Sequence, residues 1–344
     1  MSARTAGSIT AAHRQSERLS HVTQRLSPLL SERRLYRKAK PQAQLPLEHQ
    51  SLRLSDIAFY YDTVQPNRAQ LKAASALFKH SKYSPVRAWS ASEFRTIPST
   101  DMPEVAFLGR SNVGKSSLLN ALMDHEICHT SQKPGRTREM NGYGVGGLRD
   151  GHSRLVLVDM PGYGSGSREE WGEEIMKYLT KRKQLRRTYV LLDTHHGMKA
   201  SDAAMLSMLR ESAIPHQIIL SKVDSVLQKG GRRVRRGLTN EKLDNLAYLA
   251  EKIRAKVQPM RKPGEPSSGV PALGEILACS LRMPLGGGKG YLGINPIRWS
   301  ILEAAGLTRG LGEEKKAPAG AGVRAGAAAG AAARGIREEG GKKE

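Results

Sequence analysis

The sequence predicts an α/β fold in which a mostly parallel, twisted sheet is flanked by helices, with disordered extensions at both ends. Between about residues 101 and 307, short apolar runs alternate with helical patterns, as in folds built on a parallel sheet. A glycine-rich segment joins the first apolar run to the first helical pattern. Outside this region the composition becomes arginine- and serine-rich at one end and alanine- and glycine-rich at the other.

Apolar runs bounded by polar segments are candidate strands, and longer periodic segments are candidate helices. The expected strands cover residues 105–108, 155–158, 189–192, 217–220 and 276–278. The expected helices begin near Lys115, Glu169, Asp202, Glu241 and Pro296. A further helix is expected over 67–80, because Leu71, Ala74 and Phe78 recur at helical spacing.

These patterns divide the chain into four parts. Residues 1–50 are rich in arginine and serine and poor in acids, which resembles a mitochondrial transit peptide; a disordered basic arm is the alternative. Residues 51–100 are expected to form a connector with a short helix, and residues 101–307 the folded domain. Residues 308–344 are an alanine-, glycine- and lysine-rich tail that cannot bury enough apolar surface to order itself.

Composition narrows the function classes. The 344 residues carry a formal net charge of +23, which favours an anionic partner such as nucleic acid. Two cysteines, Cys128 and Cys279, do not make a disulfide framework. No apolar run approaches the roughly 20 residues that a membrane helix requires.

A phosphate-binding loop is the strongest motif. It lies between the first expected strand and the first expected helix, the context such a loop requires. Its glycines let successive N–H groups face phosphate oxygens, and the helix N-terminus adds its positive end. Lys115 should reach the β- and γ-phosphates, and the Ser116 hydroxyl should ligate Mg²⁺. The predicted loop consists of Gly109, Arg110, Ser111, Asn112, Val113, Gly114, Lys115 and Ser116, followed by Ser117.

Two later segments indicate which nucleotide is bound. Asp159, Met160, Pro161 and Gly162 form a D-x-x-G motif at a strand end, where Asp159 can hold magnesium through water and the Gly162 N–H can meet a γ-phosphate. The next segment is Ser221, Lys222, Val223 and Asp224. A carboxylate there can accept both hydrogens of the guanine N1/N2 edge, which adenine lacks. These motifs together predict GTP.

With these motifs in place, the sequence resembles the EngB family (also called YihA or YsxC) of ribosome-biogenesis GTPases, within the TrmE–Era–EngA–EngB–septin-like P-loop GTPases. The resemblance spans roughly residues 75–307 and is most specific at the phosphate loop and at the segment 159–164. Ser221 departs mildly from the family's usual threonine. The remaining matched segments are Lys133, Pro134, Gly135, Arg136 and Thr137, and, at the family's guanine loop, Ala278, Cys279 and Ser280.

The resemblance implies a Ras-like P-loop GTPase domain that hydrolyses GTP and assists assembly of the large ribosomal subunit. It implies that Thr137 joins Ser116 as a magnesium ligand. With the arginine-rich N-terminus, the organellar type is expected, located in the mitochondrial matrix; a cytoplasmic protein is the alternative. We expect a monomer.

Catalysis is expected to rest on Lys115, Thr137 and Gly162 through positioning and charge stabilisation. Tyr163 stands where Ras has a water-orienting glutamine, so slow intrinsic hydrolysis is expected. In related GTPases, an asparagine at the position of Asn112 helps to bind K⁺ beside the phosphates. Potassium stimulation is therefore a hypothesis here, and an asparagine that only caps the loop is the alternative.

Three basic clusters could contact ribosomal RNA through its phosphates, and solvated helix ends are the alternative. They comprise Lys181, Lys183 and Arg182, Arg186, Arg187; Lys229 with Arg232, Arg233, Arg235, Arg236; and Lys252, Arg254, Lys256, Arg261, Lys262. Other functions stay open: a regulatory switch in organelle trafficking or division without a ribosomal partner, an ATP-using enzyme, or a nucleotide-bound scaffold. The adjacent His195 and His196 are interpreted as a structural loop.

Overall fold

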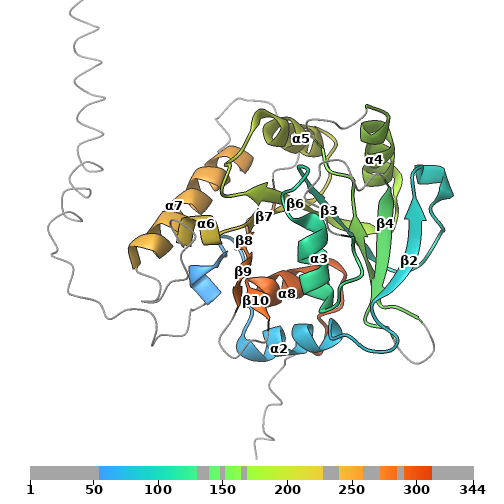
Figure 1. The fold of residues 1–344 in the computed structure, drawn as a ribbon, viewed down its shortest axis with the longest axis horizontal. Coiled ribbons are helices and arrows are strands. Elements are labelled where there is room, and N and C mark those ends of the chain that lie inside the picture. Colours follow the sequence, from blue (N-terminus) through green and yellow to red (C-terminus); the bar gives the residue numbers. More distant parts are fainter. Residues whose placement is uncertain are drawn as a thin grey trace, which may run out of the picture.

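An eight-stranded sheet with helices on both faces organises the chain (Figure 1). The computed structural model describes residues 54–129, 139–147, 152–163, 169–227, 240–258, 272–284 and 290–311. The strand order is β1-β8-β7-β6-β3-β5-β4-β2. In chain order these strands are β1 (Ala58–Phe59), β2 (Val86–Ala91), β3 (Glu104–Gly109), β4 (Met140–Val145), β5 (Leu155–Asp159), β6 (Leu185–Asp193), β7 (His216–Ser221) and β8 (Ile276–Ala278).

The centre of the sheet is parallel and its edges are antiparallel. Strands β8, β7, β6, β3 and β5 pair in parallel, whereas β4 pairs antiparallel with β5, β2 with β4, and β1 with β8. The five parallel strands are those that the apolar runs predict. A second, two-stranded sheet joins β9 (Ser280–Pro284) to β10 (Tyr291–Leu292). The predicted mostly parallel sheet is therefore confirmed.

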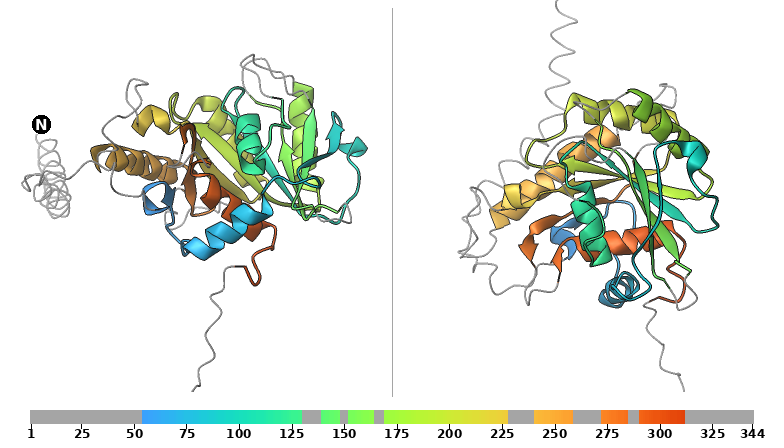
Figure 2. Two further views of the ribbon diagram at one scale, coloured as in Figure 1. Left: turned by 60° about the horizontal axis from the view of Figure 1, so that its bottom comes forward. Right: turned by 45° about the vertical axis from the view of Figure 1, so that its right-hand side comes forward.

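Helices cover the two faces of this sheet. One face carries α2 (Arg68–Leu77), α3 (Lys115–Met123) and α8 (Ile294–Ala304). The other carries α4 (Glu169–Lys181), α5 (Ala200–Glu211), α6 (Asp224–Leu227) and α7 (Asn240–Val257), as the views in Figure 2 show. Short 3-10 helices occupy Leu54–Asp56 and Phe94–Thr96. Among the described residues, no helix has the length and apolarity that crossing a bilayer requires.

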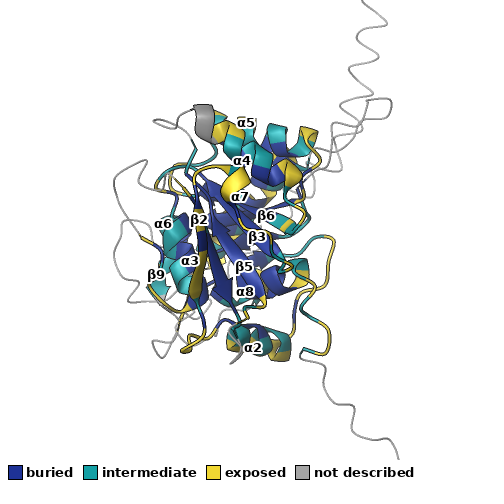
Figure 3. Cartoon of the chain, turned by 90° about the vertical axis from the view of Figure 1, so that its right-hand side faces the viewer, coloured by how far each residue is buried: buried dark blue, intermediate teal, exposed yellow. Residues whose placement is uncertain are grey.

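The buried side chains form two cores because successive residues of a strand face opposite sides of the sheet. In β3, Val105 and Phe107 pack beneath α2, α3 and α8, whereas Ala106 and Leu108 pack beneath α4 to α7. Figure 3 shows the central strands fully buried between the helical layers. A strand buried on both faces reads as a continuous apolar run, so these strands were visible in the sequence.

The segment 51–100, expected to be a connector, is built into these layers. Strand β1 pairs with β8, β2 pairs with β4, and α2 packs on α8. The domain boundary predicted at residue 101 therefore lies too late in the chain. Only α2 was expected here, and its Asn67 cap exchanges hydrogen bonds with Gln70. Strand β2 lacks an apolar run because it is an edge strand with mostly exposed side chains, and β1 has only two residues.

Two buried charged groups connect distant elements. Glu104 at the start of β3 accepts hydrogen bonds from Arg182 at 2.6 and 2.9 Å and from the Tyr178 hydroxyl at 2.6 Å. Arg298 on α8 donates to the backbone oxygens of Leu122 at 2.9 Å and Ala121 at 3.1 Å. The second contact satisfies carbonyls at the end of α3 that have no partner within the helix. Both ends of the first parallel βα unit are thereby anchored.

Candidate functional site

The predicted phosphate loop connects β3 to α3. Strand β3 ends at Gly109 and α3 begins at Lys115, so the loop occupies the carboxyl edge of the sheet at the helix N-terminus. Gly114 immediately precedes the helix with φ +105°, a conformation that residues with a side chain rarely adopt. The Val113 side chain is buried in the core beneath the loop. Helix N-terminal N–H groups therefore face the position that the sequence assigns to phosphate.

Lys115 is folded back onto this loop. Its Nζ donates to the backbone oxygens of Gly109 at 2.9 Å and Arg110 at 3.3 Å. Burial lowers the pKa of Lys115 to about 8, although the nearby Asp159 carboxylate acts in the opposite direction. A cation that is buried with backbone carbonyls as its hydrogen-bond acceptors gains strongly from an anion placed beside it. The side chain is suited to a phosphate ligand.

Asp159 and Ser116 form a second polar pair beside Lys115. Asp159 ends β5, and its Oδ2 accepts a hydrogen bond from Ser116 Oγ at 2.7 Å. Its Oδ1 is buried and has no hydrogen-bond partner in the described part of the chain. Burial raises the pKa of this carboxyl, although Lys115 and Ser116 lower it. A carboxylate oxygen without a partner next to a hydroxyl fits a hard cation.

Magnesium is the cation expected here; Ser116 would hold it directly and Asp159 through water. When bound with a nucleotide, Mg²⁺ would supply positive charge that offsets the charge of the phosphates. The other expected direct ligand, Thr137, lies outside the described residues, as do Gly135 and Arg136. Their assigned roles stay predictions.

Gly162 brings the D-x-x-G motif against the phosphate loop. A Cβ atom at this position would lie 2.8 Å from the Ser111 backbone nitrogen, so only glycine permits the approach. The Ser111 N–H donates to the Tyr163 carbonyl at 3.2 Å. Met160 is fully buried in the core, so only its backbone can face a ligand. Pro161 is likewise buried.

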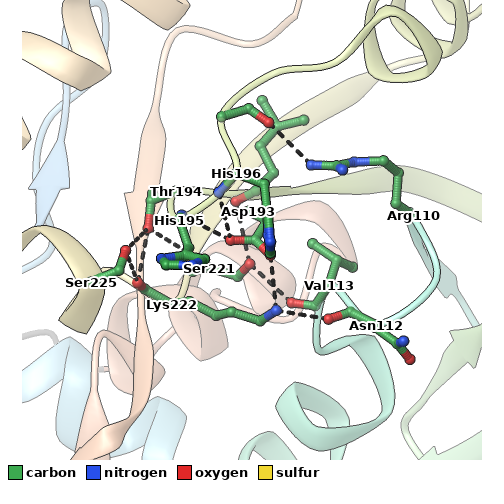
Figure 4. Close-up of polar contacts among 12 residues, drawn as sticks. Arg110, Asn112, Val113, Asp193, Thr194, His195, His196, Ser221, Lys222 and Ser225 are labelled. Atoms are coloured by element: carbon green, nitrogen blue, oxygen red, sulfur yellow. Dashed lines mark hydrogen bonds and ion pairs between the residues drawn. The ribbon is translucent and has the colours of Figure 1, made fainter. Parts of the chain in front are cut away.

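The predicted guanine-reading segment lies at the end of β7, next to the phosphate loop. Ser221 ends the strand and donates from Oγ to the Val113 carbonyl at 3.0 Å. Lys222 adopts a left-handed backbone conformation with φ +57°. Its Nζ donates to the Asn112 carbonyl at 2.8 Å (Figure 4). The side chain of Lys222 therefore bridges the two loops.

Asp193 is a second acceptor for Lys222. No role was predicted for this residue from the sequence. It ends β6, and its Oδ2 accepts from Lys222 Nζ at 2.8 Å and contacts His196 Nδ1 at 2.9 Å (Figure 4). Burial alone raises the pKa of Asp193, but hydrogen bonds from Lys222 and His196 lower it to about 2. An acidic residue at the carboxyl end of a parallel strand was the signal available in the sequence.

The segment matched to the family's guanine loop, Ala278, Cys279 and Ser280, is brought directly to Asp224. Ser280 Oγ donates to Asp224 Oδ1 at 2.7 Å. The Cys279 carbonyl accepts from the Val223 N–H at 3.2 Å. The side chains of Ala278, Cys279 and Val223 are buried, so only their backbones can face a base. The two segments that should read guanine thus meet in space, although 56 residues separate Asp224 from Ser280.

Neither a metal site at the histidines nor a fully exposed set of basic clusters is found in the described part of the chain. The described residues hold no group of three or more His, Cys, Asp or Glu side chains that could share a metal ion. In the first basic cluster, Arg182 binds Glu104 and Arg187 binds Gln217, so these two arginines serve the fold. Arg254 stacks on Tyr61, with 3.9 Å to the ring centroid. The residues 229–236 and 261–262 lie outside the described part of the chain.

The fold and the arrangement of loops around Lys115, Asp159 and Lys222 define a Ras-like P-loop GTPase. A family model described as "50S ribosome-binding GTPase" matches residues 104–222. A probable GTP-binding protein EngB from Sinorhizobium medicae is 40% identical over 169 residues, covering 46% of this chain and 73% of the relative. One from Mesorhizobium japonicum is 43% identical over 147 residues, covering 40% and 69%. The chain belongs to the EngB family of GTP-binding proteins and is a GTPase.

Among solved structures, the chain is similar to Era from Aquifex aeolicus bound to GDP and AlF4⁻. It is 19% identical, the match covers 60% of this chain and 57% of Era, and the TM-score is 0.41. At that distance the likeness carries no inference about activity.

Proposed function

We propose that this GTPase assists assembly of the mitochondrial large ribosomal subunit by contacting ribosomal RNA. Membership of the EngB family carries the proposal, together with the match to a family described as binding the 50S subunit. The net charge of +23 supports an anionic partner. Hydrolysis would then change a surface that the ribosomal precursor recognises.

In this proposal the loops around Lys115 act by positioning. Lys115 and the Gly162 N–H hold the γ-phosphate, Asp224 reads guanine, and Ser116 with Thr137 holds Mg²⁺. Tyr163 replaces an amide that could orient water, and its hydroxyl contacts Asp202 at 3.0 Å. Hydrolysis is therefore slow until a partner or an ion completes the site.

The RNA contact is expected through exposed basic side chains rather than base readout. Of the described members of the three clusters, Lys181, Lys183, Arg186, Lys252 and Lys256 are exposed. The run of Arg232, Arg233, Arg235 and Arg236 adds the densest charge in the sequence. Each phosphate contact should appear in the salt dependence of binding.

Sedimentation tests this function. Tagged protein with a GTP analogue should cofractionate with large-subunit precursors and crosslink to their RNA, and neutralising the four arginines at 232–236 should weaken binding and reduce its salt slope. A control variant neutralises Arg68, Lys72, Lys79 and Lys82, four exposed cations in and just after α2, and removes the same charge. An equal loss of binding in both variants would show that the effect depends only on net charge. Absence of ribosomal RNA from the crosslinks would contradict the function itself.

Potassium stimulation is proposed from Asn112. This residue has a left-handed backbone with φ +64°, and its carbonyl contacts Lys222. It thus joins the phosphate loop to Lys222 of the segment 221–224. GTP turnover should be faster in KCl than in NaCl at equal ionic strength, and Asn112→Ala should remove the difference. Equal turnover of the wild type in the two salts would refute it.

Mitochondrial location is proposed from the composition of residues 1–50. A fusion of these residues to a fluorescent protein should enter mitochondria. A fusion in which Arg14, Arg18, Arg25, Arg33 and Arg34 are replaced by glutamine should stay outside. Cytosolic distribution of the first fusion would refute the proposal.

A further inference from the structure

A buried carboxylate on α5 joins the phosphate loop to the segment after the D-x-x-G motif. Asp202 is fully buried in the first turn of α5. Its Oδ1 accepts hydrogen bonds from the Tyr163 hydroxyl at 3.0 Å and from Arg110 Nε at 3.1 Å. Its Oδ2 accepts from the Lys199 N–H at 2.9 Å. Both carboxylate oxygens are therefore satisfied.

Arg110 ties this carboxylate to a second loop. Its Nη2 donates to the Gly197 carbonyl at 3.0 Å, and its side chain is 13% exposed. Charged hydrogen bonds at such low exposure are stronger than surface ones because water does not screen them. The phosphate loop is consequently fixed to α5 and to the loop that precedes it.

Backbone contacts also join the phosphate loop to the segment after the D-x-x-G motif. Arg110 and Tyr163 form a parallel β-bridge, and the Ser111 N–H donates to the Tyr163 carbonyl at 3.2 Å. Gly162 lies directly against Ser111, so its N–H is held beside the phosphate loop. Moving Gly162 away requires breaking the backbone bridge, and the Tyr163–Asp202 hydrogen bond opposes that movement.

We propose that Asp202 is a positioning residue that, through Tyr163 and Arg110, holds the Gly162 amide in place for the terminal phosphate of a nucleoside triphosphate. The inference rests on the γ-phosphate contact of Gly162 in the proposed function. A diphosphate has no group at that position, so the arrangement favours triphosphate over diphosphate. An amide held in place costs less ordering entropy on binding than one that is free to move.

Tyr163→Phe removes only the hydroxyl that bonds Asp202. The chain offers a matched control: Tyr178 also donates to a buried carboxylate, Glu104, which is paired with an arginine, Arg182. Tyr178→Phe therefore deletes the same bond type away from the nucleotide loops. Affinities of fluorescent GDP and of a non-hydrolysable GTP analogue are measured for the wild type, both variants and Asp202→Asn.

Tyr163→Phe deletes a hydrogen bond to a charged acceptor, and Asp202→Asn removes the charge of that acceptor. Both variants should therefore weaken binding of the GTP analogue about tenfold and leave GDP binding within about twofold. Tyr178→Phe should lower thermal stability and leave both affinities unchanged. An unchanged or higher triphosphate preference in Tyr163→Phe would overturn the inference, as would equal weakening of both nucleotides. Failure of the wild type to bind GDP would instead contradict the proposed function.

Discussion

Asp193→Asn tests the carboxylate that holds Lys222 beside the phosphate loop. The substitution keeps the shape of the side chain. It replaces the charged carboxylate that contacts Lys222 and His196 by a neutral amide. Because Asp193 is 4% exposed, the lost interactions are barely screened by water. The variant should be less stable and should bind guanine nucleotides more weakly.

The magnitude follows from the pKa. Contacts with Lys222 and His196 lower the pKa of Asp193 from 3.8 to about 2, so the ionised form stabilises the fold by about 2 kcal/mol. A depressed carboxyl pKa contributes stability above the unfolded value near 3.8, and that stability is lost as pH falls toward 2. The difference between wild type and variant should stay constant from pH 8 to pH 5 and shrink below pH 4.

Urea unfolding at 25 °C measures this difference, and a melting-temperature decrease of roughly 5 °C should accompany it. GDP affinity should decrease about three- to tenfold, because Lys222 loses the charged acceptor that helps to hold it beside the phosphate loop. Asp244→Asn, the same change at an exposed position of α7, is the control and should stay within about 0.5 kcal/mol of wild type. A similarly small effect in Asp193→Asn would refute the reasoning. Lower stability with unchanged GDP affinity would refute the link to nucleotide binding.

Three further changes test other parts of the molecule. Burial lowers the pKa of Lys115 to about 8, so GDP binding should take up a proton and GDP affinity should fall from pH 8 to pH 9. An equal decrease in the affinities for GDP and for guanosine over this pH range would contradict the prediction. Arg298→Met should cost about 3 kcal/mol in urea unfolding, because the Leu122 carbonyl loses a buried charged donor; a cost below about 1 kcal/mol would argue against that anchor. Asp224→Asn should shift binding from guanine toward xanthine nucleotides, whereas Ser280→Ala should weaken guanine binding without reversing the preference; an unchanged ranking in Asp224→Asn would contradict the guanine assignment.

Much of the fold could be predicted because its central strands are buried on both faces. Strands β3, β5, β6, β7 and β8 appear as apolar runs, and each precedes or follows a helical pattern. The antiparallel strands β2 and β4 could not be recognised in the same way. Glycine at two of the six positions in β4 and exposed side chains in β2 remove the apolar signal, and these strands form because they pair with the sheet.

The local motifs by themselves determined the chemistry, because a phosphate loop, a D-x-x-G segment and a guanine-reading aspartate each need only a few adjacent residues. Only the tertiary structure decided which distant groups hold them. Lys222 meets Asp193 across 29 positions, and Arg110 meets Asp202 across 92. Parallel strands bring their carboxyl ends to one edge of the sheet, so residues far apart in the chain become neighbours there. The separation of these residues along the sequence does not predict that they are neighbours.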